Sequence, residues 1–278
     1  MHGLARCGHD EAVEAALSGS FDSIAHAHVL ALVKQWLATP VADSGGRGGW
    51  RRTTRAKDAK RGVPQGAPIS PLLSNLYMRR FVLGRKVLGH QRRLDAYIVN
   101  YADDFVICCR RGTAQAAMAV MRTMMERLGL AVNESESGIR RLPDESVEFL
   151  GYTMGRCYSR QTGRAYVGTR ASKRSVRRAT QAVSRLTARR TGGWEAESLV
   201  GRLNRMLTGW GRYYCLGPVT PAYRAVDAHV RHRLRRWLRK THKCGGRATK
   251  RFPNEFLYDT LGLVRLEQTT PDLPWAKA

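Results

Sequence analysis

The feature that most constrains the fold is a pair of adjacent carboxylates, Asp103 and Asp104, set between two apolar runs. Residues 98–99 precede the pair and residues 105–109 follow it, an arrangement that predicts two strands joined by a tight turn. Adjacent carboxylates repel each other and resist desolvation unless a cation or a proton compensates their charge. Mg²⁺ suits this role because it prefers carboxylate oxygens, and two such ions would serve phosphoryl transfer. Taken alone, the pair also fits an exposed hairpin in which Asp-Asp is only turn chemistry.

A segment rich in Pro and Gly precedes this hairpin and runs into an apolar helix. It contains the triplet Pro-Gln-Gly at residues 64–66, and Ser70 and Pro71 then provide an N-cap and a first helical residue. We expect four apolar residues of this helix to pack against the sheet: Leu72, Leu73, Leu76 and Tyr77. A methionine stripe within residues 114–128 predicts a second core helix, and residues 145–158 predict another hairpin.

The C-terminal part of the chain has a different character. Residues 172–188, 195–214 and 222–240 repeat apolar side chains at helical spacing with arginines between them, which predicts three basic amphipathic helices. We expect Trp210 and Trp237 to belong to the core of these helices. The tail from residue 253 keeps apolar residues and is expected to pack on them.

The net charge of +26 is unevenly distributed. Residues 1–150 hold 21 Lys and Arg against 15 Asp and Glu, a net of +6, whereas residues 151–278 hold 27 against 7, a net of +20. Such a concentration of positive charge requires a polyanion, and nucleic acid is the leading candidate. No apolar run of about 18 residues predicts a membrane span, and the N-terminal residues lack the apolar core of a signal peptide. The six cysteines form no Cys-x-x-Cys pair, so the sequence predicts a cytoplasmic protein without a zinc site or a disulfide framework.

Taken in order, these motifs resemble those of the reverse transcriptases encoded by group II introns. The Pro-Gln-Gly triplet and the Tyr-Ala-Asp-Asp sequence at residues 101–104 have the family's order, and Val-Glu-Phe-Leu-Gly-Tyr at 147–152 looks like its palm-closing segment. Residues 203–214, which end in Gly-Trp-Gly-Arg-Tyr-Tyr, look like the maturase-specific thumb signature. The resemblance implies an α+β fold. A partial palm, an antiparallel sheet with helices, would span residues 1–168, and an all-α thumb or maturase-specific RNA-binding domain would span residues 169–278.

The resemblance also implies roles for individual residues. Asp103 would be the main Mg²⁺ ligand and Asp104 an auxiliary one, so both would be catalytic. Gln65 and Gly66 would lie against the incoming nucleotide, and Phe21 matches the aromatic residue that blocks a ribose 2′-hydroxyl; the alternatives are a turn for the first two and the core for Phe21. Structured RNA of a group II intron, with DNA as a further candidate, would be bound by the following residues: Arg174, Arg177, Arg178, Arg212, Tyr214, Arg231, Arg235 and Arg236. For Tyr214, base stacking and a place in the core are both open.

The sequence departs from the family pattern at sites that polymerisation needs. Ala16 stands where the family has its first metal-binding aspartate, and Glu14, two residues earlier, is displaced by about 6.6 Å along a strand. Glu136 stands where the family has a lysine that assists the leaving pyrophosphate. The chain also begins almost at the first catalytic strand, so we expect the fingers to be largely missing. We therefore expect a reverse transcriptase/maturase relative that binds intron RNA with impaired polymerase activity. The alternatives are a non-enzymatic RNA-binding splicing module and a decayed fragment.

Overall fold

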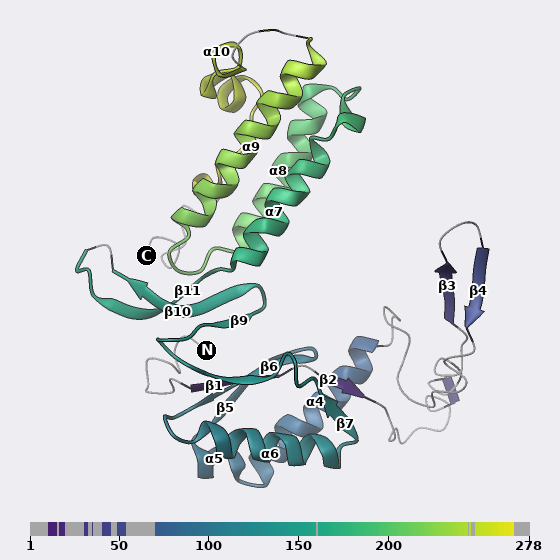
Figure 1. Ribbon diagram of the computed structural model, residues 1–278, viewed down its shortest axis with the longest axis vertical. Coiled ribbons are helices and arrows are strands. Elements are labelled where there is room, and N and C mark those ends of the chain that lie inside the picture. Colours follow the sequence, from purple (N-terminus) through teal and green to yellow (C-terminus); the bar gives the residue numbers. More distant parts are fainter. Residues whose placement is uncertain are drawn as a thin grey trace. The chain divides into compact units, whose positions relative to one another are not determined.

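The computed structural model describes residues 11–15, 17–19, 31–32, 35, 41–45, 49–53, 70–159, 161–243, 245 and 248–269 (Figure 1). The chain divides into two compact units, Met1–Leu142 and Pro143–Ala278. The boundary predicted at residues 168 and 169 lies within the second unit, near the end of its sheet. Predicted residues Ala16, Phe21, Gln65 and Gly66 lie outside the described residues.

The first unit is built on a four-stranded antiparallel sheet with the strand order β5-β6-β1-β8. These strands are β1 (Glu11–Ala15), β5 (Tyr97–Tyr101), β6 (Asp104–Cys109) and β8 (Gly138–Arg141). Two further strand pairs are β2 (Leu17–Gly19) with β7 (Leu130–Val132), and β3 (Val41–Gly45) with β4 (Gly49–Thr53). β6 is a central strand, and its residues 105–109 are all buried. An apolar run of this kind is expected of a strand covered on both faces.

Three helices accompany this sheet: α4 (Ser70–Val87), α5 (His90–Leu94) and α6 (Ala114–Arg127) (Figure 1). Met78 and Phe81 of α4 share a core with Phe105 and Ile107 of β6 and with the methionines of α6. The predicted methionine stripe is therefore confirmed as core, because Met118, Met121 and Met125 are all buried.

One prediction for α4 is wrong in part. Leu73 and Tyr77 are buried as expected, but Leu72 and Leu76 are 57% and 39% exposed. Successive residues of a helix are rotated by about 100° around its axis. Leu73 and Tyr77 therefore lie on one face of α4, and Leu72 and Leu76 lie on another. Only one of these two pairs can face the core that holds Met78 and Phe81.

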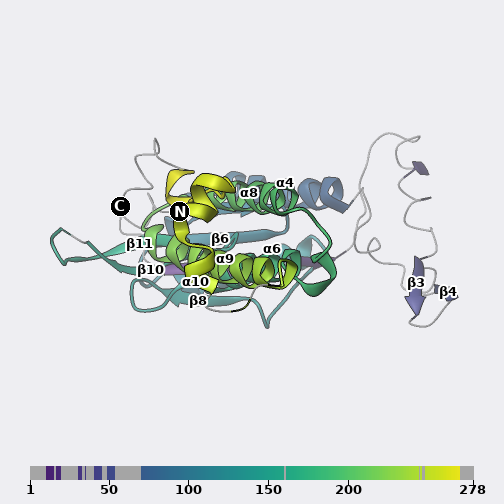
Figure 2. The same cartoon turned by 90° about the horizontal axis from the view of Figure 1, so that it is seen from above.

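The second unit begins with a three-stranded antiparallel sheet of order β11-β10-β9. Its strands are β9 (Val147–Phe149), β10 (Tyr152–Tyr158) and β11 (Ala165–Ala171). β9 and β10 confirm the hairpin predicted for residues 145–158, and Figure 2 shows the long β10–β11 hairpin in the view from above.

A helical region follows this sheet, and its three main helices lie side by side in Figure 1. They are α7 (Lys173–Leu186), α8 (Ala196–Tyr213) and α9 (Thr220–Thr241). The shorter elements are η1 (Arg189–Thr191), α10 (Ala248–Arg251), η2 (Phe256–Thr260) and η3 (Leu266–Gln268). All three predicted amphipathic helices are confirmed. Ser172 caps α7 by accepting a hydrogen bond from the backbone N–H of Ser175 at 3.1 Å.

The apolar faces of the three helices form one core, to which the C-terminal segment contributes. Leu257, Leu263 and Leu266 are buried there, so the predicted packing of the tail on the helices is confirmed. Trp237 is buried and Trp210 packs against the same core, as expected. Every helix among the described residues is too short or too polar to cross a bilayer. The predicted α+β fold, with helices dominating the C-terminal part, is confirmed.

Candidate active site and nucleic-acid interface

The carboxylates of the Tyr-Ala-Asp-Asp sequence lie at a two-residue hairpin turn. β5 ends at Tyr101 and β6 begins at Asp104, and these two residues form the pair next to the turn. Ala102 has a φ of +52°, as both common two-residue hairpin turns require at their first central position. A residue other than glycine adopts this conformation at a cost of about 1 kcal/mol. The strained turn leaves both Asp103 and Asp104 exposed.

The electrostatic environment of this hairpin is acidic. Partial burial raises the pKa of the Asp104 carboxyl above its usual range, and the negative charges of Asp103 and Glu136 raise it further. Each of these causes disfavours the ionised form, and a bound cation would remove the repulsion. The role of Asp103 and Asp104 as ligands of a divalent cation stays a prediction, and simple turn chemistry stays the alternative.

Strand β1 runs directly beside the second strand of the hairpin. Its register places Glu14 opposite Val106 and Ala15 opposite Phe105, so the described pairing stops one residue short of Asp104. The next residue, Ala16, lies outside the described residues, and its role stays a prediction.

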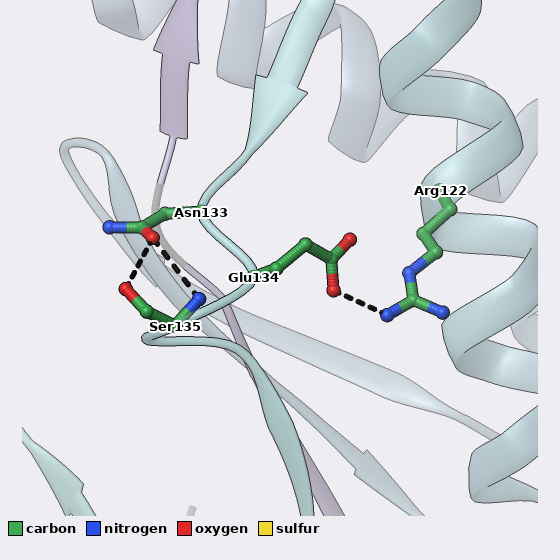
Figure 3. A network of polar contacts seen from close by, with 4 residues as sticks. All are labelled: Arg122, Asn133, Glu134 and Ser135. Carbon is green, nitrogen blue, oxygen red and sulfur yellow. Dashed lines mark hydrogen bonds and ion pairs between the residues drawn. The ribbon is translucent and has the colours of Figure 1, made fainter.

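The turn after β7 carries two further carboxylates, Glu134 and Glu136, and Figure 3 shows the contacts of Glu134 and Asn133. The Asn133 side-chain oxygen accepts hydrogen bonds from the backbone N–H of Ser135 at 3.2 Å and from its hydroxyl at 2.8 Å. Glu134 forms an ion pair with Arg122 of α6 at 2.6 Å. Glu136 accepts a hydrogen bond from the Asn133 side-chain amide at 3.0 Å. Arg122 therefore compensates Glu134, whereas the charge of Glu136 is left to act on Asp104.

The acidic residues fit one Mg²⁺ ion better than a complete two-metal site. Among the residues that the structure describes, no group of three or more His, Cys, Asp or Glu side chains is placed to hold a metal. Mg²⁺ is commonly bound by one or two carboxylates together with water and substrate phosphates, and Asp103 and Asp104 can provide such a pair. The ion, when bound, would neutralise charge on phosphate oxygens.

Five of the predicted RNA-binding arginines are exposed: Arg174, Arg177, Arg178, Arg212 and Arg236. The first three lie on α7, which turns its apolar residues Ala179 and Val183 to the core. In the described part of the chain, none of these five arginines has an acidic partner within ion-pair distance. Their guanidinium groups are therefore available to bind phosphate.

The other two predicted arginines are occupied within the molecule. Arg231 donates a hydrogen bond to the Tyr258 hydroxyl at 3.0 Å. Arg235 donates to the carbonyl of Phe252 at 2.8 Å and to the side-chain oxygen of Asn254 at 2.7 Å. These contacts hold the C-terminal segment against α9, so a role in RNA binding would compete with a role in folding.

Tyr214 lies in an aromatic cluster at the end of α8. Its ring centroid is 4.7 Å from that of Tyr213, 5.2 Å from that of Trp210 and 5.2 Å from that of Tyr152 on β10. The Tyr213 hydroxyl donates to the carbonyl of Leu150 at 3.1 Å, and the Tyr152 hydroxyl donates to the carbonyl of Tyr213. The cluster joins the sheet of the second unit to its helices. This placement favours the core alternative for Tyr214.

Several cations that were not predicted as site residues lie near the end of α9: Arg189, Arg233, Lys240 and Lys243. The spacing of Arg233, Arg236, Lys240 and Lys243 is helical, which was a usable signal. Arg189 comes from η1, and its proximity depends on tertiary packing.

Two family models match the chain. Residues 8–154, more than half of the chain, match Reverse transcriptase (RNA-dependent DNA polymerase). Residues 176–252 match Group II intron, maturase-specific domain. None of the curated proteins compared matches the chain.

Among solved structures, telomerase from Candida albicans in complex with the TWJ fragment of telomeric RNA aligns over 90% of this chain. The chain spans 48% of the telomerase chain, with 10% identity and a TM-score of 0.38, a likeness too weak to support an argument about function. The family matches confirm the resemblance stated from the motifs. The chain belongs to the reverse transcriptase family and carries the maturase-specific domain of group II intron proteins.

Proposed function

We propose that this chain binds structured RNA of the group II intron type through its helical unit, and so assists folding of that RNA. The observation that carries the proposal is the exposed, unpaired set of arginines on α7, Arg174, Arg177 and Arg178. Phosphate groups are the partners that such a set favours, because guanidinium groups bind phosphate oxygens through paired hydrogen bonds.

The charge distribution supports this proposal and suggests where RNA binds. Residues 151–278 carry 27 Lys and Arg against 7 Asp and Glu. Because Arg231 and Arg235 hold the C-terminal segment, the α7 side together with Arg212 and Arg236 is the better interface. DNA shares the phosphate backbone and remains a further partner in the proposal. The predicted prokaryotic-type cytoplasm is the compartment that this RNA partner implies.

Filter binding of a structured intron RNA to the full chain across a salt series tests the RNA-binding proposal. The logarithm of the association constant should fall linearly with the logarithm of the salt concentration. Each phosphate contact in duplex regions should contribute about −0.9 to the slope. The variant Arg174→Gln/Arg177→Gln/Arg178→Gln should weaken binding and make the slope less steep by about 2 to 3. The matched control is Arg79→Gln/Lys86→Gln/Arg92→Gln, which removes the same charge from exposed residues of α4 and α5. If the affinity of the wild type for RNA did not depend on salt concentration, the RNA-binding proposal would be wrong.

We further propose that the polymerase activity of this chain is impaired. Asp103 and Asp104 offer a carboxylate pair, but Ala16 cannot supply the third ligand, and Glu136 adds negative charge near Asp104. A metal site that lacks one ligand positions its ion poorly, and positioning is a large part of phosphoryl-transfer catalysis.

Primer extension on an RNA template with Mg²⁺ tests this second proposal. The wild type should show little extension, and Ala16→Asp should raise it; adding Glu136→Lys and a grafted fingers segment should raise it further. Asp103→Asn should abolish whatever extension is present. Robust extension by the wild type would overturn the claim of impairment. RNA binding with no extension by any variant would favour the non-enzymatic splicing module.

A further inference from the structure

A positively charged hollow of about 640 Å³ lies at one end of the helical bundle of the second unit. It is bounded by the chain just after α7, by η1 and by the last turns of α9. Five cationic side chains line it, and no Asp or Glu does: Arg189, Arg233, Arg236, Lys240 and Lys243. Only Arg236 among them belongs to the RNA-binding set predicted from the sequence.

The walls of this hollow are held in place by hydrogen bonds. Arg233 donates to the Thr187 hydroxyl at 2.9 Å, to the Thr187 carbonyl at 3.1 Å and to the Ser184 carbonyl at 3.0 Å. The buried Trp237 donates its indole N–H to the carbonyl of Thr191 at 3.2 Å. These bonds tie α9 to the end of α7 and to η1. The cations are therefore presented by a fixed scaffold, which lowers the entropy cost of binding an anion.

The cations repel one another, and the described residues provide them with no acidic ion-pair partner. The pKa of the Lys240 ammonium is lowered by Arg189 above all, then by its partial desolvation and by Arg236, Arg233 and Arg239. In the described part of the chain, none of the cations that line the hollow takes part in an ion pair. The C-terminal end of α9 contributes only a fraction of a negative charge. A bound external anion would compensate this positive charge.

Lys243 provides a second, independent observation. It follows the C-cap of α9 with a φ of +48°, a conformation that glycine adopts most readily after a helix. A lysine here strains the backbone while placing another ammonium group at the hollow. Glycine would end the helix with less strain but would leave the hollow without this ammonium group.

We infer that this hollow binds the phosphodiester backbone of folded RNA at two or more neighbouring phosphates, without reading base identity. Its volume exceeds what one phosphate fills, and the four lining cations other than the hydrogen-bonded Arg233 match several negative charges. Trp237 is 4% exposed and so offers no face on which a base could stack. The inference rests on the proposed RNA-binding function and adds a contact site separate from the exposed arginines of α7.

The test compares the full-length variant Arg236→Gln/Lys240→Gln with the control Lys86→Gln/Arg92→Gln, which removes the same charge from the first unit. With a structured RNA at fixed salt, the hollow variant should raise Kd roughly 10- to 100-fold and make the salt slope less steep by about 2, equally for RNAs of unrelated sequence. The control should change Kd less than about threefold. If the wild type binds with a steep salt slope but the two variants weaken binding equally, the inference is overturned and the proposed function stands. If the wild type shows no salt-sensitive binding, both are overturned.

Lys243→Gly separates binding from folding at the same site. Glycine relieves the backbone strain and removes one charge, so Tm should stay the same or rise while Kd for RNA rises about three- to tenfold. If Lys243→Gly bound RNA with the same Kd as the wild type, Lys243 would not contribute to RNA binding. Calorimetric titration with inorganic tripolyphosphate distinguishes a small anion from RNA. If the hollow variant lost tripolyphosphate binding but kept full RNA affinity, the hollow would be a small-anion site and the inference would be wrong.

Discussion

In the first unit two adjacent carboxylates lie at one hairpin and Glu136 of a neighbouring turn acts on Asp104 electrostatically, whereas in the second unit five cations line one hollow. Like charges repel in both places: the pKa of Asp104 is raised by partial burial and further by Asp103 and Glu136, and the pKa of Lys240 is lowered chiefly by Arg189. Neither cluster belongs to the apolar core of its unit. Charge that opposes folding and contributes nothing to the core is typical of a binding site.

The two clusters differ in how far their charge extends, and this difference indicates the size of each ligand. The carboxylates are close together on and beside one turn, which suits a small, hard cation. The cations are spread over two helices and a turn and continue along α7, which suits an extended polyanion. The comparison predicts that a divalent cation acts on the first unit and RNA on the second.

The largest effect should come from adding RNA. At a free concentration one hundred times its Kd, structured RNA should stabilise the folded chain by about 2.7 kcal/mol. Hydrogen exchange should show the added protection in α7 and α9 and little in β5 and β6. Protection of the β5–β6 hairpin equal to that of α7 would contradict the assignment of RNA to the second unit. Mg²⁺ at millimolar concentration without RNA serves as the reference, and its protection should appear at the hairpin.

A buried carboxylate in the basic unit provides the next largest effect. Burial raises the pKa of Asp227 to about 6, although its carboxylate accepts a hydrogen bond from the Leu266 N–H and lies near Arg231 and Arg265. An unfolded aspartate has an ordinary pKa near 3.8. Between these two values the folded state binds more protons at Asp227 than the unfolded state. The contribution of Asp227 to stability is therefore greatest below about pH 4 and is lost as the pH rises through about 6.

Asp227→Asn should therefore be more stable than the wild type at pH 7 to 8, and this advantage should disappear near pH 4. We expect a difference of about 1 kcal/mol, which allows for screening by solvent and by the nearby arginines. Urea unfolding at several pH values provides the measurement, with the exposed Asp259→Asn as the control. If the difference in free energy of unfolding between Asp227→Asn and the wild type did not change with pH, ionisation of Asp227 would not be the cause of that difference.

Sequence periodicity predicted the helices of the second unit well, because each helix has one apolar face that the core must cover. It could not predict which arginines remain free. Arg231 and Arg235 resemble Arg236 in the sequence, but the C-terminal segment lies over them and its carbonyl, hydroxyl and amide oxygens accept their hydrogen bonds. In the same way, α4 contains two apolar pairs, Leu72 with Leu76 and Leu73 with Tyr77. Only tertiary packing decides that the second pair is the buried one.

The candidate site was predicted in part for a similar reason. The two apolar runs around Asp103 and Asp104 predicted the hairpin, and the resemblance to the family motifs suggested its role. The sequence could not show that Ala102 adopts a positive φ, or that the amide of Asn133 rather than a cation contacts Glu136. The hollow of the second unit could not be predicted from the sequence. Arg189 of η1 lies far along the chain from the lysines and arginines of α9, and only the tertiary fold brings them together.

The smallest effect should come from neutralising one carboxylate of the hairpin. Because the pKa of Asp104 is raised in the folded state, its ionised form opposes folding at neutral pH, and the opposition disappears as the pH falls below the ordinary value of 3.8. Asp104→Asn should therefore stabilise the chain at pH 7 by about 0.5 kcal/mol, a small value because the residue is exposed. The control Asp144→Asn removes an ion pair with Arg156 and should give no gain. Mg²⁺ should stabilise the wild type more than Asp104→Asn, which chemical denaturation with and without the ion measures. If Asp104→Asn lowered the stability in the absence of Mg²⁺, the ionised Asp104 would stabilise the hairpin. Like-charge repulsion would then not oppose folding in the first unit, and the comparison with the cations of the second unit would fail.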